Sequence, residues 1–204
     1  MDGPVTSDAD PKVLASDEDR LVARAIQRDQ AAFARLYETY LDRIYRYIYY
    51  RVASTAEAED LTEQVFLKAW EVIDRYEPRG APFAAWLYRL AHNLIVDYYR
   101  SKRATTSLDD VRETEEPGAD VVDLVEETLE IEELRTAIRR LSPEHQQLIA
   151  LRFVEGLSHA EVAQIIGKSE GATRVIQHRA LQALARALRQ TGCRPPGEPG
   201  RSPG

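Results

Sequence analysis

The sequence LSHAEVAQIIGKSEGATRVIQHR, residues 157–179, predicts two helices joined by a tight turn. Ser158 and, three residues later, Glu161 form a capping box at the start of the first helix. Gly167 is suited to end that helix, because glycine adopts the left-handed backbone of a helix C-terminus without steric cost. Ser169 can then cap the second helix. The pattern is typical of a helix-turn-helix, whose second helix can enter the major groove of DNA.

The spacing of small and apolar residues predicts which face of the second helix points inward. We expect this helix to end near Leu188. Small and apolar residues recur four positions apart, with two neighbours alongside. They are Ala172, Ile176, Ala180, Leu184 and Leu188, with Thr173 and Ala183 beside them. We expect this stripe to pack against the rest of the domain.

The outward face of the same helix has the chemistry of a major-groove reader. It consists of Gly171, Arg174, Val175, His178 and Arg179. Arginine donors match guanine acceptors, and a small apolar side chain matches a thymine methyl. Lys168 and Ser169 lie at the helix N-terminus, where phosphates bind. A helical hairpin with a solvated basic face would carry the same charges, so these residues leave both interpretations open.

The composition is that of a globular chain. Hydrophobic residues make up 44% and charged residues 30% of the sequence, and 204 residues allow one or two domains. No apolar run approaches the roughly 20 residues that cross a membrane, and the start MDGP lacks the features of a signal peptide. We therefore expect a cytoplasmic protein that does not insert into a membrane.

No catalytic or metal-binding pattern is present in the sequence. The single cysteine, Cys193, lies in a Gly/Pro-rich tail and excludes an internal disulfide and a thiolate cluster. The four histidines do not form a zinc motif, and no phosphate-binding loop or nucleophile elbow occurs. We expect no enzyme activity, no metal and no other cofactor.

The net charge of −7 comes from one acidic segment. Between Asp109 and Glu133 the only basic residue is Arg112, and the remainder of the chain is mildly basic. The first part of this segment, around Pro117, has the composition of a flexible linker. The predicted division is a disordered start (1–16), a helical module (17–103), an acidic linker (104–128), a second module (129–190) and a disordered tail (191–204).

Apolar residues with a helical period run through both modules. The predicted helices cover 33–52, 61–73, 83–103 and 134–141, followed by a helix that Ser142-Pro143 starts and by the helix-turn-helix. Ser54 and Glu57 form a capping box ahead of the second helix, and Pro143 suits a first helical position. No strand pattern competes. The fold class is therefore all-α, with two small helical domains.

The helix after Pro82 places aromatic and polar groups beside a basic end. Trp86, Arg89, His92 and Asn93 precede the sequence RSKR at residues 100–103. Aromatic rings can stack on unpaired bases while cations hold the phosphates. Packing in the core is the competing role for Trp86, and the residues leave both roles open.

Three motifs in order resemble a known family. They are AEDLTEQVFLKAW at 58–70, PFAAWLYRLAHNLIVDYYR at 82–100, and LSPE at 141–144 running into the helix-turn-helix. Together they resemble bacterial RNA polymerase sigma factors of the sigma-70 family, in the compact extracytoplasmic-function group. The resemblance covers nearly all of residues 17–189. It implies a protein that lends promoter choice to the polymerase core enzyme.

The resemblance implies that the first module is sigma region 2. One of its helices would dock on the clamp helices of the largest polymerase subunit through Asp60, Leu61, Glu63 and Gln64. The next helix would bind and help to open the minus-10 element through Trp86, Arg89, Asn93, Arg100, Lys102 and Arg103. Its cations would hold phosphates, which position the DNA without specifying sequence.

The resemblance implies that the second module is sigma region 4, which would touch the flap of the second-largest polymerase subunit. It would read the minus-35 element through Lys168, Ser169, Arg174, Val175, His178 and Arg179. An anti-sigma factor that covers the polymerase-binding or DNA-binding faces is a further expected partner. Charge alone also allows the acidic linker to fold over the basic surfaces.

Two departures from the family pattern limit what is carried over. Relatives often have Gln-Glu one residue after the Asp-Leu pair, where this chain has Glu63-Gln64. We therefore expect the polar contact to the clamp to be rearranged. Val175 and Ile176 replace positions that are often polar. We expect Ile176 to pack inward and Val175 to face outward, which leaves the minus-35 sequence open.

Two other functions stay possible on the sequence. A stand-alone helix-turn-helix regulator would bind duplex DNA without polymerase, but it needs a ligand-binding or dimer domain and usually a two-fold operator. A regulatory adaptor without DNA contact would be unaffected by Arg174→Ala and Arg179→Ala. Association with core polymerase distinguishes a sigma factor from both.

Overall fold

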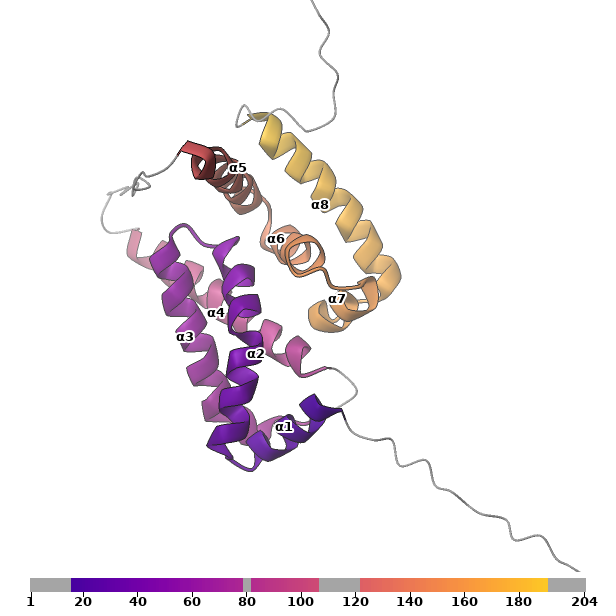
Figure 1. The fold of residues 1–204 in the computed structure, drawn as a ribbon. Helices are drawn as coiled ribbons and strands as arrows, with labels where there is room; N and C mark the ends of the chain where they lie inside the picture. The colour runs from indigo at the N-terminus through magenta and orange to yellow at the C-terminus, as the bar shows by residue number, and fades with distance from the viewer. Residues whose placement is uncertain (1–15, 79–81, 107–121, 191–204) are drawn as a thin grey trace, which may run out of the picture.

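The computed structural model describes residues 16–78, 82–106 and 122–190, without the side chains of 103–106 and 122–128. Every element in these ranges is helical, which confirms the all-α prediction. The N-terminal unit contains α1 (Asp17–Ile26), α2 (Gln30–Tyr49), α3 (Thr55–Val72), the 3-10 turn η1 (Ile73–Arg75) and α4 (Phe83–Thr106). The C-terminal unit contains α5 (Val122–Arg139), α6 (Pro143–Ile149), the π-helical turn η2 (Ala150–Val154), α7 (His159–Ile166) and α8 (Glu170–Gln190) (Figure 1).

The helix starts follow the predicted capping residues. Capping boxes join Ser54 to Glu57 and Ser158 to Glu161, and each satisfies backbone donors that a helix N-terminus leaves unpaired. Pro143 occupies the first turn of α6 behind the cap Ser142. The helix α1, which has a capping box of its own from Ser16, was not predicted because it is short and buries only two residues of its stripe.

The turn between α7 and α8 has the predicted geometry. Gly167 ends α7 with φ of 68°, in the left-handed region that favours glycine. The Ser169 hydroxyl oxygen accepts a hydrogen bond from the Ala172 backbone N–H at 3.2 Å. These two residues therefore fix the direction in which α8 leaves α7.

The core of the N-terminal unit lies between α2, α3 and α4. Its fully buried side chains lie in the predicted helices 33–52, 61–73 and 83–103, and they include Leu36, Ile44, Tyr47, Val65, Leu87 and Ile95. Ring contacts join the helices, for example the edge contact of Tyr47 on Tyr88 at 5.1 Å between centroids. Burial of these apolar surfaces is the main term that stabilises the unit.

The inward face of α8 differs in part from the prediction. Thr173 and Ala180 are fully buried as expected, but Ala172 is exposed, and the buried Ala187 was missed. The prediction for Ala172 is wrong because residues four apart drift by about 40° per step on a helix of 3.6 residues per turn. Positions 172 and 188 thus differ by about 160° and cannot both face the core.

Both ends of the predicted acidic linker are helical. α4 continues to Thr106 and α5 begins at Val122. The Glu- and Leu-rich sequence after Val122 has a high intrinsic helix propensity, which accounts for the earlier start. The predicted linker residues 107–121, and nearly all of both predicted disordered ends, lie outside the described residues.

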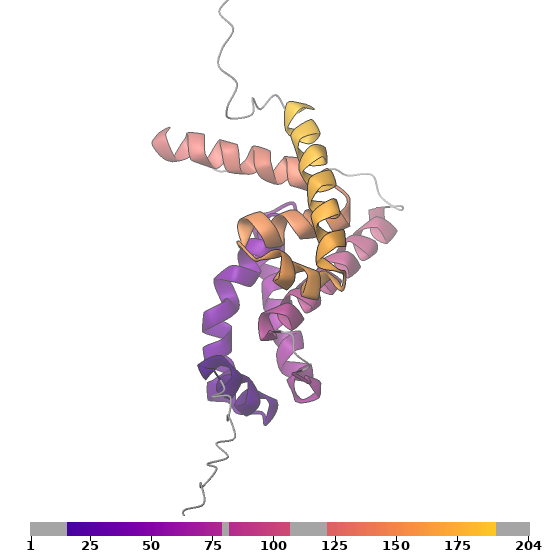
Figure 2. The same cartoon turned by 90° about the vertical axis from the view of Figure 1, so that its right-hand side faces the viewer.

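The two units pack against each other. α7 lies against α4, and η2 lies against α2 (Figures 1 and 2). Leu151, Leu157, Val162 and Ile165 of the C-terminal unit join the hydrophobic cluster of the N-terminal unit. Within the described ranges, no helix combines the length and the apolar character that crossing a bilayer requires.

Candidate nucleic-acid interface

The outward face of α8 is exposed as predicted. Val175 is 52% exposed, whereas its neighbour Ile176 is half-buried against the cluster around Ile138. Arg174 makes an ion pair with Glu170 one turn earlier at 3.5 Å, and both side chains remain largely exposed. An ion pair of this kind contributes little in water, so the guanidinium can exchange to another acceptor. The predicted duplex-reading residues therefore share one accessible surface.

The N-terminus of α8 is held in place by its neighbours. The Lys168 ammonium lies 3.1 Å from a Glu144 carboxylate oxygen of α6. The Ser169 hydroxyl is occupied by its capping hydrogen bond, so Ser169 positions the helix as well as lying at its start. Backbone N–H groups and the helix dipole make this end attractive to a phosphate.

On α4, Trp86 packs within an aromatic cluster. Its ring centroid lies 5.0 Å from that of Tyr76 and 5.3 Å from that of Phe83. Trp86 is half-buried there. Of the two roles left open by the sequence, this structure shows core packing. Asn93 is exposed, in keeping with a surface contact.

Arg89 of α4 is occupied by the C-terminal unit. Its Nε donates to the Ile165 carbonyl at 3.2 Å, and its Nη2 donates to the Gln164 carbonyl. Both acceptors belong to the C-terminal end of α7, where helix carbonyls lack intrahelical partners. Arg89 is exposed, as Asn93 is, but two of its guanidinium nitrogens are bound to α7.

The basic end of α4 is paired with carboxylates. Arg100 lies 3.2 Å from Asp97, and the Lys102 ammonium lies 2.7 Å from Glu57 of α3. The hydrogen bond to Glu57 raises the pKa of Lys102. Burial raises the pKa of Glu57, but hydrogen bonds from Lys102 and Tyr98 outweigh it and hold that pKa below its usual range. The Arg103 side chain lies outside the described residues.

His92 of α4 is neutral near physiological pH. Its Nδ1 lies 3.3 Å from Nη2 of Arg51. Burial, and then the charge of Arg51, lowers the pKa of His92 to about 4. His92 therefore adds no charge to this surface.

The predicted polymerase-binding residues of α3 divide into two groups. Asp60, Glu63 and Gln64 are exposed and share a surface. Leu61 is 3% exposed and packs in the core, so the expectation that it contacts a partner is wrong. Leu61 and Val65 are one turn apart on α3, so their side chains lie on the same face of the helix. Both belong to the hydrophobic core cluster that also contains residues of α2.

An apolar groove beside Glu63 was missed by the sequence analysis. It has a volume of about 480 Å³ and is lined mainly by Phe33, Tyr37, Phe66, Leu67 and Trp70. Leu67 is 56% exposed, which is unusual for leucine on a packed helix. The signal was present in the sequence, because Leu67 lies off the stripe formed by positions 61, 65 and 69.

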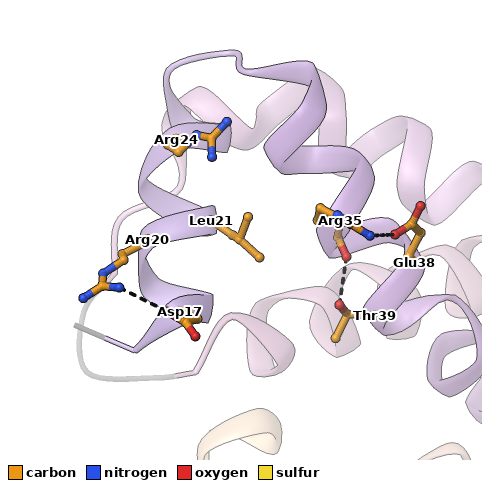
Figure 3. Close-up of a pocket in the computed structure, with 7 residues that line it drawn as sticks. All are labelled: Asp17, Arg20, Leu21, Arg24, Arg35, Glu38 and Thr39. Carbon is orange, nitrogen blue, oxygen red and sulfur yellow. Dashed lines mark hydrogen bonds and ion pairs between the residues drawn. The ribbon is translucent and has the colours of Figure 1, made fainter. Parts of the chain in front are cut away.

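A hollow between α1 and α2 carries charged residues but offers no anion site. Figure 3 shows Arg20, Arg24 and Arg35 around Leu21. Each arginine is paired within its own neighbourhood, to Asp17 at 3.1 Å, Asp29 at 2.7 Å and Glu38 at 3.0 Å respectively. The charges in the hollow are therefore locally neutralised. None of its lining residues belongs to the predicted DNA-binding or polymerase-binding sets.

Comparisons with known proteins fit the two units in order. Residues 36–105 match the family model for sigma-70 region 2, and residues 137–186 match that for sigma-70 region 4. The ECF RNA polymerase sigma factor BldN of Streptomyces coelicolor is 44% identical over 173 residues, which are 82% of this chain and 64% of BldN. This chain thus spans less than two thirds of BldN.

Two further likenesses extend over most of the compared protein. The ECF RNA polymerase sigma factor SigW of Bacillus subtilis is 33% identical over 172 residues, covering 79% of this chain and 91% of SigW. The solved structure of CnrH, in complex with the cytosolic domain of CnrY, is 25% identical with a TM-score of 0.65, covering 85% of this chain and 99% of CnrH. With both sigma regions present in order, the chain belongs to the sigma-70 family of RNA polymerase sigma factors, in the extracytoplasmic-function (ECF) group.

Proposed function

We propose that this chain binds RNA polymerase core enzyme and directs promoter recognition, DNA opening and transcription initiation. The observation that carries the proposal is the order of two sigma regions in one chain, of which the second presents an exposed basic helix on a helix-turn-helix. A factor of this kind performs no reaction of its own. It acts in the cytoplasm, where the polymerase is.

The minus-35 element is read by α8 in this proposal. The contact residues are Lys168, Ser169, Arg174, Val175, His178 and Arg179. Guanidinium donors suit guanine acceptors in the major groove, and the exposed Val175 suits a thymine methyl. Lys168 and the N-terminus of α8 suit the flanking phosphates.

The minus-10 element is bound by α4, within the module 17–103. Asn93 is the exposed polar candidate for a base contact, and Arg89, Arg100, Lys102 and Arg103 hold phosphates. Trp86 supports this surface from within its aromatic cluster, since it is half-buried in this structure. The ion pairs of Arg100 and Lys102 must exchange their carboxylates for phosphates when DNA binds.

Core polymerase binds the α3 surface in this proposal. Asp60, Glu63 and Gln64 supply polar contacts, and Leu67 takes the apolar role that had been given to Leu61. An apolar groove with a polar rim suits an amphipathic helix, which fits the clamp helices of the largest subunit. The module 129–190 would contact the flap of the second-largest subunit.

An anti-sigma factor is a further proposed partner. The support is that CnrH was solved in complex with the cytosolic domain of CnrY. A partner that covers α3 or α8 would block polymerase or DNA directly.

Reconstitution with purified core enzyme tests the function. We expect the chain to co-elute with core polymerase and to direct transcripts from promoters mapped by genomic start sites. Leu67→Asp should abolish co-elution, because it places a charge in the apolar groove. Leu129→Asp is the matched control, since Leu129 is equally exposed, at 54%, but lies on α5.

The two rival functions, a stand-alone DNA-binding regulator and an adaptor without DNA contact, predict different results. A stand-alone regulator would bind duplex DNA but would neither co-elute with polymerase nor start a transcript. An adaptor would retain its function in the Arg174→Ala and Arg179→Ala variants. Either result would contradict the sigma-factor proposal.

A further inference from the structure

Arg28 has an unusual backbone conformation for its residue type. It lies in the turn between α1 and α2 with φ of 64°, in the left-handed region that favours glycine. The other two positions with a positive φ among the described residues are Gly156 and Gly167. An arginine at this position costs conformational energy that glycine would avoid, and such strain is commonly found at functional sites.

The hydrogen bonds of this turn are made by the backbone alone. The Arg28 N–H donates to the Ala25 carbonyl at 2.9 Å, and the Asp29 N–H donates to the Arg24 carbonyl at 3.2 Å. This pair of bonds is the Schellman motif that ends many helices, and its left-handed residue is usually glycine. Glycine at position 28 could make both bonds, so the ending of α1 does not account for the arginine.

The Arg28 guanidinium binds the C-terminal end of α3. It donates to the carbonyls of Trp70 and Glu71, the latter at 3.0 Å. Its Nη2 also lies 2.9 Å from a carboxylate oxygen of Asp74. The last turn of α3 contains no basic residue of its own, and its carbonyls lack intrahelical partners. Arg28 therefore supplies, from another element, the cation that the negative end of the helix dipole favours.

The same side chain contacts one wall of the apolar groove to which the proposed function assigns polymerase binding. The guanidinium carbon of Arg28 lies 5.4 Å from the centroid of the Trp70 ring, and the Phe33 ring lies 5.0 Å from that ring. Phe33 and Trp70 both line the groove, and Trp70 is half-buried. Trp70 is thus held at its carbonyl by a hydrogen bond and at its ring by a cation and a second ring.

We propose that Arg28 is a positioning residue for polymerase binding, which holds Trp70 in the orientation that the groove needs to receive a helix of the core enzyme. The link to polymerase rests on the proposed function, whereas the effect on Trp70 does not. A preformed wall avoids the entropy cost of ordering a large side chain during association. Without it, only the molecules with the correct ring orientation bind, and the apparent Kd rises by the inverse of their fraction.

The fluorescence of Trp70 tests the positioning role. The chain has two tryptophans, so Trp86→Phe leaves Trp70 as the single reporter. In that background, Arg28→Gly removes the guanidinium and the backbone strain together. We expect a higher acrylamide quenching constant and a lower fluorescence anisotropy for Trp70, because its ring and its carbonyl each lose a contact.

Core binding and stability, measured in the chain with both tryptophans, distinguish positioning from general support of the fold. Arg28→Gly should raise the apparent Kd for purified core polymerase by roughly three- to tenfold. The midpoint of urea denaturation should stay close to that of the parent protein, because relief of the strain offsets the lost contacts. A merely structural role would lower stability and affinity together.

Two further variants isolate the contribution of the guanidinium. Arg28→Lys keeps the positive charge and the strained backbone, but an ammonium lacks the planar fork that reaches two carbonyls and a carboxylate. It should resemble Arg28→Gly in quenching and in core affinity. The matched control is Arg20→Gln, which removes an exposed arginine paired with Asp17 on α1 and should change neither.

Three results would overturn the proposal. They are unchanged quenching of Trp70 in Arg28→Gly, raised quenching with unchanged affinity for core polymerase, and a loss of affinity accompanied by an equal loss of stability. Failure of the proposed function would look different. Core polymerase would then not bind the parent protein, although the quenching of Trp70 would still differ between Arg28→Gly and Arg20→Gln.

Discussion

The two candidate DNA surfaces differ in which part of the molecule occupies their cations. On the duplex-reading surface, Lys168 and Arg174 pair with exposed carboxylates of the same unit. On α8, Arg174 has a surface pair within its own helix, and its neighbours on the outward face are exposed. On α4, Arg89 donates to α7 and Lys102 is paired with Glu57 of α3. The duplex-reading surface is therefore preformed, whereas the surface for the opened strand requires rearrangement. This matches the chemistry, because a rigid helix suffices to read a groove, but capture of an unpaired strand follows DNA opening.

The largest expected effect comes from the support beneath α8. Ala180→Asp places a carboxylate at a fully buried position and should lower the free energy of unfolding by about 3–5 kcal/mol. Ala172→Asp puts the same group on the exposed side and should change stability little. Urea denaturation of both variants measures the difference. Equal losses would mean that the corrected inward face of α8 is misassigned.

The next effect concerns the preformed surface itself. Arg174→Ala should weaken binding to a minus-35 duplex by about 1–3 kcal/mol and relax selectivity at one base pair. Fluorescence anisotropy with duplexes altered one base pair at a time measures both. Arg186→Ala, on an exposed position further along α8, is the control. Unchanged affinity and selectivity in Arg174→Ala would remove α8 as the reader.

A smaller effect concerns the occupied surface and its pH dependence. The folded-state pKa of His92 is lowered to about 4 from 6.5, so its neutral form stabilises the fold fully above about pH 6.5. This contribution is lost as pH falls toward 4. Between pH 7 and pH 5 the loss should be about 1 kcal/mol, after a discount for partial solvent screening.

Urea denaturation at the two pH values, in the parent protein and in His92→Gln, isolates this contribution. The variant lacks the titrating group, so its stability should fall less over the same interval. An equal fall in both proteins would show that His92 is not the group responsible.

The smallest expected effect is at the basic end of α4. Arg100→Gln removes an exposed pair with Asp97 and should leave the free energy of unfolding unchanged within error. If Arg100 contacts a phosphate, the variant should bind single-stranded DNA with a salt dependence reduced by about 0.7 in slope. Anisotropy titrations over a series of salt concentrations measure this slope. A slope equal to that of the parent protein would exclude the phosphate contact.

The helical fold and its caps were predictable because they depend on neighbours in the sequence. Ser158 with Glu161, Pro143 and Gly167 act within one turn of their own helix, and the apolar period of 3.6 residues repeats locally. Prediction was weaker where it depended on the exact direction of a side chain. Ala172 was assigned to the wrong side, because a small error in helical phase accumulates along a helix. Leu61 was given a partner contact by the family resemblance, although its apolar period places it on the core stripe with Val65.

The contacts between the two units belong to the tertiary structure alone. Glu155 and Arg43 are 112 positions apart, and Arg89 and Ile165 are 76 apart, so no local period or cap relates them. In the sequence, Glu155 is one more surface-type carboxylate and Arg89 one more basic residue of a DNA-binding helix. The packing of η2 on α2 brings the Glu155 carboxylate to Arg43 and Arg46, and the packing of α7 on α4 brings the Arg89 guanidinium to the α7 carbonyls. Local residue order is enough to form the helices and the candidate DNA-reading face, but the availability of that second, α4 surface depends on long-range burial and charge pairing.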